Sequence, residues 1–197
     1  MKARLWPILL AGLLLISALS LPASAADVPF SDVADSAWYY ESVERVYEKN
    51  WMNGTGNDRF SPDDSLTRAM LAVILWRIEG SQDASRTVTF TDTSANAWYA
   101  DGLSWCAEKG LFAGYPNGSF GPDDAVTREQ LAIVFFRYAE KTGAVPSGQV
   151  GHATFKNGCP WAADACDWAN EHGLFTDAIG TLDLCAPASR AEIAYLL

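Results

Sequence analysis

The sequence predicts an all-α fold made of three helix–loop–helix repeats. Residues 30–77 and 90–137 are the same segment written twice without a gap, and a third, more divergent copy begins at Phe155. Each strong copy carries an apolar face at helical spacing, then a turn-rich loop, then a second and strongly apolar helix. A period of about 60 residues is typical of a modular array, in which each unit buries its apolar face against its neighbours. Any site is therefore expected up to three times.

Aromatic, acidic and basic residues recur in the same order in the two strong copies. In the third copy Trp161, Gly173 and Ser189-Arg190 fall at the corresponding places. The identical pairs include Phe30/Phe90, Asp32/Asp92, Trp38/Trp98, Tyr39/Tyr99, Gly54/Gly114, Phe60/Phe120, Thr67/Thr127, Arg68/Arg128 and Arg77/Arg137.

The first helix of each repeat is predicted from residues at positions i, i+4, i+7 and i+8, which lie on one helical face. The stripe is strong in two copies and weak in the third. Its members are Tyr39, Val43, Val46 and Tyr47, then Tyr99, Leu103, Cys106 and Ala107, and finally Ala162, Cys166, Ala169 and Asn170.

Polar residues just before these helices are candidate N-caps, because a side-chain oxygen can accept from a free backbone N–H. Gly110 and Gly173 are the expected helix ends, with Asn50 in that role in the first repeat. The candidate caps are Asp35 or Ser36, and Ser94 or Asn96.

The second helix of each repeat begins at a clear cap. Thr127 and Ser189 are each followed three residues later by Gln or Glu, which fits the S/T-x-x-E/Q capping box. Thr67 caps without a box, because Met70 stands at that place. These helices are so apolar that we expect them in the middle of a bundle.

Two polar stretches, 80–89 and 143–154, link the repeats and are short enough to join packed modules. The third repeat either has an unusually short second helix or is truncated within it. The predicted organisation is a signal peptide at 1–25 and repeats at 26–82, 86–143 and 152–197.

The first 25 residues predict a secretory signal. Lys2 and Arg4 form a basic start, residues 5–21 are almost wholly apolar, and Ala23-Ser24-Ala25 fits a cleavage site. An uncleaved membrane anchor is the alternative, which interruptions of the apolar run disfavour. No later stretch is long and apolar enough to span a bilayer, so we expect a secreted protein without a membrane segment.

The charge and the histidine count exclude several function classes. A formal net charge of −10 argues against nucleic acid and anionic membrane surfaces as partners, although a local cationic pocket could still hold an anion. The chain has only 2 histidines, so no Ser–His–Asp or Cys–His site is indicated. The acidic pairs Asp63-Asp64 and Asp123-Asp124 lack the D-x-D-x-D-G series of a calcium loop. We therefore expect no metal, no cofactor and no enzymatic activity.

Three arginines are the strongest candidate site residues. Arg68, Arg128 and Arg190 each follow a cap and so occupy the first position of a helix, where the helix dipole disfavours a cation. One interpretation is an anion site, in which a guanidinium and free backbone N–H groups converge on a carboxylate. The other is a salt bridge to the preceding acidic pair. Replacing Arg128 is expected to weaken ligand binding while leaving stability nearly unchanged.

Tryptophans and aspartates are further candidates. An indole can stack on a sugar ring, so Trp38, Trp98 and Trp161 at the starts of the first helices could bind a glycan, or could be core residues. Asp32 and Asp92 could accept hydrogen bonds from ligand hydroxyls, or could form turns.

The four cysteines lie at 106, 159, 166 and 185, and an exported chain meets oxidising conditions. A zinc site would need Cys159, Cys166, His172 and Cys185, but no C-x-x-C pair supports it. The favoured pair is a Cys159–Cys185 disulfide, with Cys106 as a packed thiol like Cys166.

Three motifs in fixed order carry a family resemblance. Phe-x-Asp with Trp-Tyr, then Gly-Tyr-Pro-Asn-Gly-x-Phe-x-Pro-Asp-Asp, then Thr-Arg-Glu-Gln-Leu-Ala, resemble the S-layer homology (SLH) domain over nearly all of residues 28–197. The resemblance implies a three-pronged spindle with pseudo-threefold symmetry. It also places a glycine-rich loop at Gly114 to Gly118, where the first repeat has Asp58 in place of the last glycine, and 177–180 replace the motif in the third.

The resemblance implies a secreted, non-catalytic anchor on the cell wall or S-layer. Its expected partner is pyruvylated secondary cell-wall polysaccharide or another glycan linked to peptidoglycan, and the pyruvate ketal of that ligand is an anion. The alternative is a scaffold that assembles with S-layer proteins. The glycan-binding residues it implies are the three arginines and three tryptophans above, with Asp32, Asp92, Gly114 and Gly118.

Overall fold

The computed structural model describes residues 28–87, 89–143, 155–157, 160–174 and 182–197. The predicted signal peptide therefore lies outside the described residues. The helices are α1 (Tyr40–Glu48), α2 (Arg68–Ile78), α3 (Ala100–Glu108), α4 (Arg128–Thr142), α5 (Ala163–Glu171), which follows a 3₁₀ turn at Pro160–Ala162, and α6 (Arg190–Leu196).

The all-α class is confirmed. Among the described residues the only named strands are β1 (Phe155–Asn157) and β2 (Leu182–Asp183), which pair in parallel. No helix in the described part of the chain has both the length and the apolar character needed to cross a bilayer.

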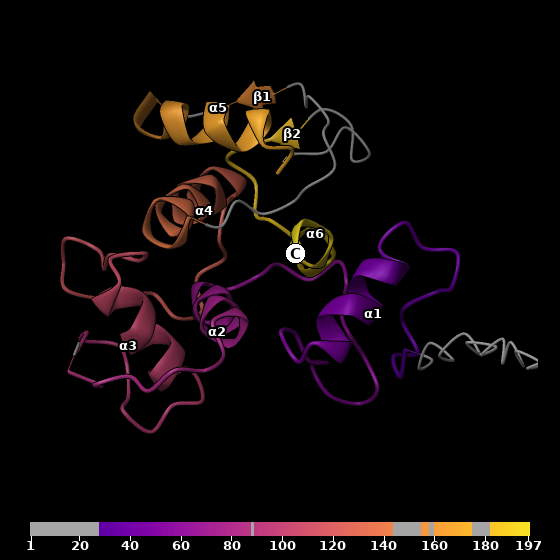
Figure 1. Ribbon diagram of the computed structural model, residues 1–197, viewed down its shortest axis with the longest axis horizontal. Helices are drawn as coiled ribbons and strands as arrows, with labels where there is room; N and C mark the ends of the chain where they lie inside the picture. The colour runs from indigo at the N-terminus through magenta and orange to yellow at the C-terminus, as the bar shows by residue number, and fades with distance from the viewer. Residues whose placement is uncertain (1–27, 88, 144–154, 158–159, 175–181) are drawn as a thin grey trace, which may run out of the picture.

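Three inner helices and three outer helices form the body of the molecule. Figure 1 shows α2, α4 and α6 together at the centre, with α1, α3 and α5 around them. Each inner helix packs against the outer helix of the following pair, so that α2 contacts α3, α4 contacts α5, and α6 returns to contact α1. Each helix pair therefore depends on another pair to bury its apolar surface.

A closed ring of three backbone hydrogen bonds joins the loops just before the inner helices. The amide of Leu66 donates to the carbonyl of Ala188 at 2.9 Å. Ala188 donates to Val126 at 2.8 Å, and Val126 donates back to Leu66 at 2.8 Å. All three residues are fully buried. Buried backbone groups need partners, and here each partner belongs to a different helix pair.

The inner helices begin as their caps predict. Thr127 and Ser189 each form a complete capping box, and Thr67 accepts from the amide of Met70 without one. The helices start at the predicted arginines.

The predicted caps of the outer helices are wrong. α1 and α3 begin later, after Tyr39 and Tyr99, and neither of these residues makes a side-chain cap. Before α1 the amide of Ala37 donates to Ala34, and Tyr40 donates to Ala37. Such consecutive backbone turns already satisfy the amides that a polar side chain would cap. The predicted polar residues Asp35, Ser36, Ser94 and Asn96 therefore lie upstream, in the turns.

The predicted ends and faces of the outer helices are largely confirmed. Asn50, Gly110 and Gly173 have φ values of 56°, 69° and 70°, which is the left-handed conformation that ends a helix. The inward stripe is buried at its central positions, whereas Tyr47 is 36% exposed. The buried stripe residues are Val43, Val46, Leu103, Cys106, Ala162, Cys166 and Ala169.

The cysteines of the stripe are packed side chains. Cys106 donates to the carbonyl of Ala72 at 3.4 Å, and its burial raises the pKa of the thiol far above the ordinary value. Cys166 is buried as well. Cys159 lies outside the described residues, so its pairing with Cys185 stays a prediction.

Removing residues 144–197 should abolish cooperative folding. This truncation deletes α6, the partner of α1, and Ala188, which closes the backbone ring. The apolar faces of α1 and α4 would then meet water. Circular dichroism and light scattering should show a fragment that aggregates or melts without a sharp transition. A soluble fragment 26–143 that melts cooperatively would contradict this.

Candidate functional site

The arginine at the start of each inner helix reaches across to a different helix pair. Arg190, at the start of α6, donates from Nε to the carbonyl of Phe60 and from one Nη to that of Asn53, both at 2.7 Å. Arg68, at the start of α2, makes the equivalent pair of bonds to Phe120 and Ala113, both at 2.8 Å. The two guanidinium groups therefore hold neighbouring loops.

Aromatic rings cover the buried faces of these guanidinium groups. Arg190 lies 4.6 Å from the ring centre of Phe60, and Arg68 lies 4.6 Å from that of Phe120 and 4.8 Å from that of Tyr115. Burial lowers the pKa of both arginines, yet a guanidinium remains charged in proteins. The carbonyls and π faces offset the cost of placing a cation at a helix start.

Arg128 is held differently. Its Nε lies 3.0 Å from Oε2 of Glu192, its Nη2 lies 2.5 Å from Oε1, and its Nη1 donates to the carbonyl of Asp183 at 3.1 Å. The two side chains are only 14% and 10% exposed, so this is a largely buried ion pair. The predicted salt-bridge partners, Asp123-Asp124, are not the ones used.

The helix starts offer few free amides for an anion. The amide of Arg190 donates to Asp64, that of Ala191 donates to Pro62, and that of Glu192 donates to the Ser189 hydroxyl. The other two inner helices use their first three amides in the same way. Any attraction for an anion therefore comes from side chains rather than from the exposed helix terminus assumed from the sequence.

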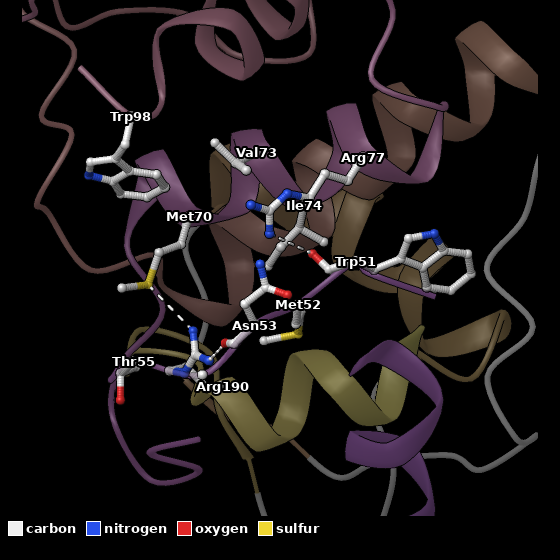
Figure 2. Close-up of a pocket in the computed structure, with 11 residues that line it drawn as sticks. Trp51, Met52, Asn53, Thr55, Met70, Val73, Ile74, Arg77, Trp98 and Arg190 are labelled. Atoms are coloured by element: carbon white, nitrogen blue, oxygen red, sulfur yellow. Dashed lines mark hydrogen bonds between the residues drawn. The ribbon is translucent and has the colours of Figure 1, made fainter. Parts of the chain in front are cut away.

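A pocket of about 420 Å³ lies beside Arg190. It collects residues from all three helix pairs: the loop 53–55 and α2, Trp98 before α3, and Arg190 of α6. Figure 2 shows Met70 between Trp98 and Arg190, with Asn53 on the far side of the arginine. Among the described residues that line the pocket, two are cationic, Arg77 and Arg190, and none is acidic.

An exposed indole and a guanidinium nitrogen that binds no carbonyl are the groups in this pocket that suit a sugar with a negative charge. Trp98 is 64% exposed, which leaves indole surface for stacking. The Nη1 of Arg190 lies 3.8 Å from the sulfur of Met70, a weak acceptor, while the other two nitrogens bind carbonyls. That nitrogen keeps most of its capacity to donate to a ligand.

The other two tryptophans are also at the surface. Trp38 is 48% exposed and packs edge-on against Tyr195 of α6, with ring centres 5.4 Å apart. Trp161 is 60% exposed and lies in the 3₁₀ turn before α5. None of the three tryptophans is a core residue.

Asp32 and Asp92 use both carboxylate oxygens to hold loops. Asp32 accepts from the amides of Phe60 and Ser61 at 2.8 and 2.9 Å. Asp92 accepts from Phe120 and Gly121, both at 2.7 Å. Burial acts to raise the pKa of each aspartate, but these hydrogen bonds outweigh it, so both pKa values lie below the ordinary value. The carboxylates thus fix the carbonyls of Phe60 and Phe120 that bind the arginines.

The glycines of the loops allow close packing and a tight turn. A Cβ on Gly54 would lie 2.6 Å from the ring of Phe30, and one on Gly114 would meet Phe90. Gly118 has a φ of 83°, and its carbonyl accepts from Thr91 at 3.1 Å. Asp58 takes the same place in the first loop with a φ of 52° and keeps the equivalent bond, from Ser31 at 2.7 Å. The corresponding segment 177–180 lies outside the described residues.

Sequence reasoning missed several pocket residues. Arg77 was visible as part of the identical Arg77/Arg137 pair, and its burial lowers its pKa. Asn53, Thr55 and Met70 carried no signal, because they differ from their counterparts in the second copy and matter through contacts across helix pairs.

The family model of the S-layer homology domain matches residues 29–70 and 89–132. These two matches contain the loops, the arginines at 68 and 128 and the tryptophans at 38 and 98. The chain is an SLH domain protein. The helix pair α5–α6 lies beyond the matched residues, so its status as a third SLH repeat stays a prediction, as do the repeat boundaries.

Similar proteins are larger. An endoglucanase of Bacillus sp. (strain KSM-635) is 33% identical over 146 residues, which are 68% of this chain and 15% of the enzyme. A cellulosome-anchoring protein of Acetivibrio thermocellus is 33% identical over 102 residues, 50% of this chain and 23% of that protein. A surface-layer 125 kDa protein of Lysinibacillus sphaericus is 28% identical over 186 residues, 92% of this chain and 15% of that protein. The SLH chain thus spans less than a quarter of each.

Replacing Arg128 with Met should destabilise the SLH protein by about 3 kcal/mol, because it leaves the buried carboxylate of Glu192 without its cation. This reverses the near-neutral effect expected from the helix dipole alone. The measurement is urea unfolding. A double variant with Glu192→Met should recover part of the loss, since no buried charge then remains. If Arg128→Met alone is as stable as the wild type, the Arg128–Glu192 ion pair contributes nothing to the free energy of unfolding.

Acid should weaken the loops that Asp32 and Asp92 hold. A carboxylate whose folded-state pKa is lowered contributes stability above its unfolded pKa of about 3.9, and this is lost as pH falls through the folded value. Asp92→Asn should therefore cost about 1–2 kcal/mol at pH 7 and less near pH 2, where protonation removes the charge. Thermal melts at both pH values measure this. Asp123→Asn, at an exposed position, is the control. An equal loss of stability for Asp92→Asn at both pH values would contradict the role of the charged Asp92 carboxylate in holding the loop.

Proposed function

We propose that this SLH protein is a non-catalytic module that anchors to the bacterial cell wall by binding an anionic wall glycan. The observation that carries the proposal is the pocket at Arg190, where two guanidinium groups and an exposed indole gather without a lining carboxylate. In a chain with a net charge of −10, such a local cationic pocket needs an explanation. Binding of a glycan that carries a carboxylate would explain this pocket.

The proposed ligand is pyruvylated secondary cell-wall polysaccharide or a related glycan linked to peptidoglycan. Its pyruvate ketal carboxylate would accept from Nη1 of Arg190, and its sugar ring would stack on Trp98. The Asn53 amide and the Thr55 hydroxyl line the same pocket and can bind sugar hydroxyls. Each group matches one chemical feature of such a saccharide.

Equivalent residues would line two further grooves around the ring, in one of which Arg128 is already paired with Glu192. Arg68 and Trp161 would belong to a second groove, and Arg128 and Trp38 to a third. The α5–α6 pair would then be a third, divergent SLH repeat. Asp32, Asp92, Gly114 and Gly118 would shape the grooves, because their contacts hold the loops.

The names of similar proteins support a role at the cell surface. They include a cellulosome-anchoring protein and a surface-layer protein. The endoglucanase shares with this chain only 15% of its own length, so its enzyme name need not describe the matched region. We therefore propose export by the signal peptide, a cell-wall or S-layer location, and no enzymatic activity.

Sedimentation with purified cell walls tests this function. The protein should sediment with walls that carry the anionic polysaccharide, less with walls stripped of it, and less as salt concentration rises. Equal sedimentation with both kinds of wall would contradict glycan binding and favour the alternative, a scaffold for S-layer proteins.

Pocket variants link this binding to the site. Trp98→Ala and Arg77→Gln should each weaken wall binding about tenfold or more, since a stacking or charged contact contributes about 1–3 kcal/mol. The melting temperature of Trp98→Ala should hardly change, because the side chain is exposed. Lys141→Gln removes the same charge from an exposed residue outside the pocket and serves as the control. Wall binding unchanged by both pocket variants would exclude this pocket.

A further inference from the structure

In two of the three inner helices, the third residue contacts the arginine that begins the preceding inner helix in the ring. Met70 of α2 places its sulfur 3.8 Å from Nη1 of Arg190. Glu192 of α6 places its carboxylate on two nitrogens of Arg128. The corresponding residue of α4 is Gln130. One helical position therefore carries an apolar, an amide and an acidic side chain in the three helix pairs.

The side chain at this position sets the charge that a ligand would meet. Glu192 neutralises Arg128 with two charge-assisted hydrogen bonds in a largely buried setting. Met70 brings no charge to Arg190, which is 5% exposed and lines a pocket that also holds Arg77. A ligand carboxylate at Arg128 would have to displace Glu192 and leave it buried beside a second negative charge. At Arg190 it meets no such competitor.

We infer that the third residue of the inner helix decides which arginine can bind an anionic saccharide. Met70 opens the groove at Arg190, whereas Glu192 fills the groove at Arg128 with a carboxylate of the chain itself. This inference rests on the proposed function and deepens it, because it makes Glu192 an internal competitor of the ligand. Wall anchoring then depends on the Arg190 pocket and not on the Arg128 groove.

The test introduces the competitor into the open pocket. Met70→Glu places a carboxylate near Arg190, and Met70→Gln is the matched uncharged control. Met70→Glu should fold, because Thr67 followed three residues later by Glu completes the capping box that Ser189 and Glu192 already form. A melting curve verifies this.

The probe is a methyl hexoside with a 4,6-linked pyruvate ketal, and its neutral methyl ester is the ligand control. The indole N–H signal of Trp98 in ¹⁵N NMR reports binding in the Arg190 pocket. We expect the acid to shift this signal in the wild type and in Met70→Gln with similar affinity. Met70→Glu should bind it at least about tenfold more weakly, because the arginine is already paired.

The reciprocal variant opens the closed groove. Glu192→Gln keeps a capping box of the Thr127–Gln130 kind but removes the charge that holds Arg128. Trp38, which packs on Tyr195 one turn after Glu192, should then begin to respond to the acid.

The outcomes separate the two proposals. Equal binding by Met70→Glu and Met70→Gln, with the Trp98 signal still shifting, would overturn the inference while the glycan pocket stands. A wild-type Trp98 signal that responds to neither ligand, or equally to acid and ester, would overturn the anion pocket and the inference together. Loss of the Trp98 response in Met70→Glu alone supports both.

Discussion

The reach of each helix-start arginine into a neighbouring loop is the interaction on which the rest of the structure depends. A cation at the first position of a helix is unfavourable, and its burial adds a desolvation cost. The structure offsets both with carbonyls and aromatic faces from another helix pair, as at Arg190 and Phe60. The carbonyls are themselves held by aspartates such as Asp32. The backbone ring through Leu66, Val126 and Ala188 closes the same junctions, so the helix pairs form one cooperative unit.

The contact between Arg190 and the loop of another helix pair also creates the proposed binding site. Two nitrogens of Arg190 donate to carbonyls in the loop between α1 and α2, while the third faces a pocket completed by Trp98 and Arg77. Residues from all three helix pairs meet there, so the site exists only when the ring is closed. Folding and the proposed ligand recognition would therefore use the same guanidinium, and the pocket is cationic although the chain has a net negative charge.

Local features of the fold were predictable from the sequence, and contacts across the ring were not. The capping boxes, the arginines at the helix starts and the left-handed ends at Asn50 and Gly110 depend on residues a few positions apart. The starts of the outer helices were misplaced because backbone turns replace the polar caps. The pairing of Arg128 with Glu192 joins residues 64 positions apart, which no local pattern reveals. For the same reason the repeat predicted equivalent sites, whereas the structure makes them electrostatically different.

The most direct measurement is a crystal structure of the protein bound to a pyruvate-ketal fragment of wall polysaccharide. We expect the ketal carboxylate within hydrogen-bonding distance of Nη1 of Arg190 and the sugar ring stacked on Trp98. We also expect the Arg128–Glu192 pair to stay closed in the same crystal. A carboxylate bound at Arg128 with Glu192 displaced, or a ligand that leaves the Arg190 pocket empty, would contradict anion binding at Arg190.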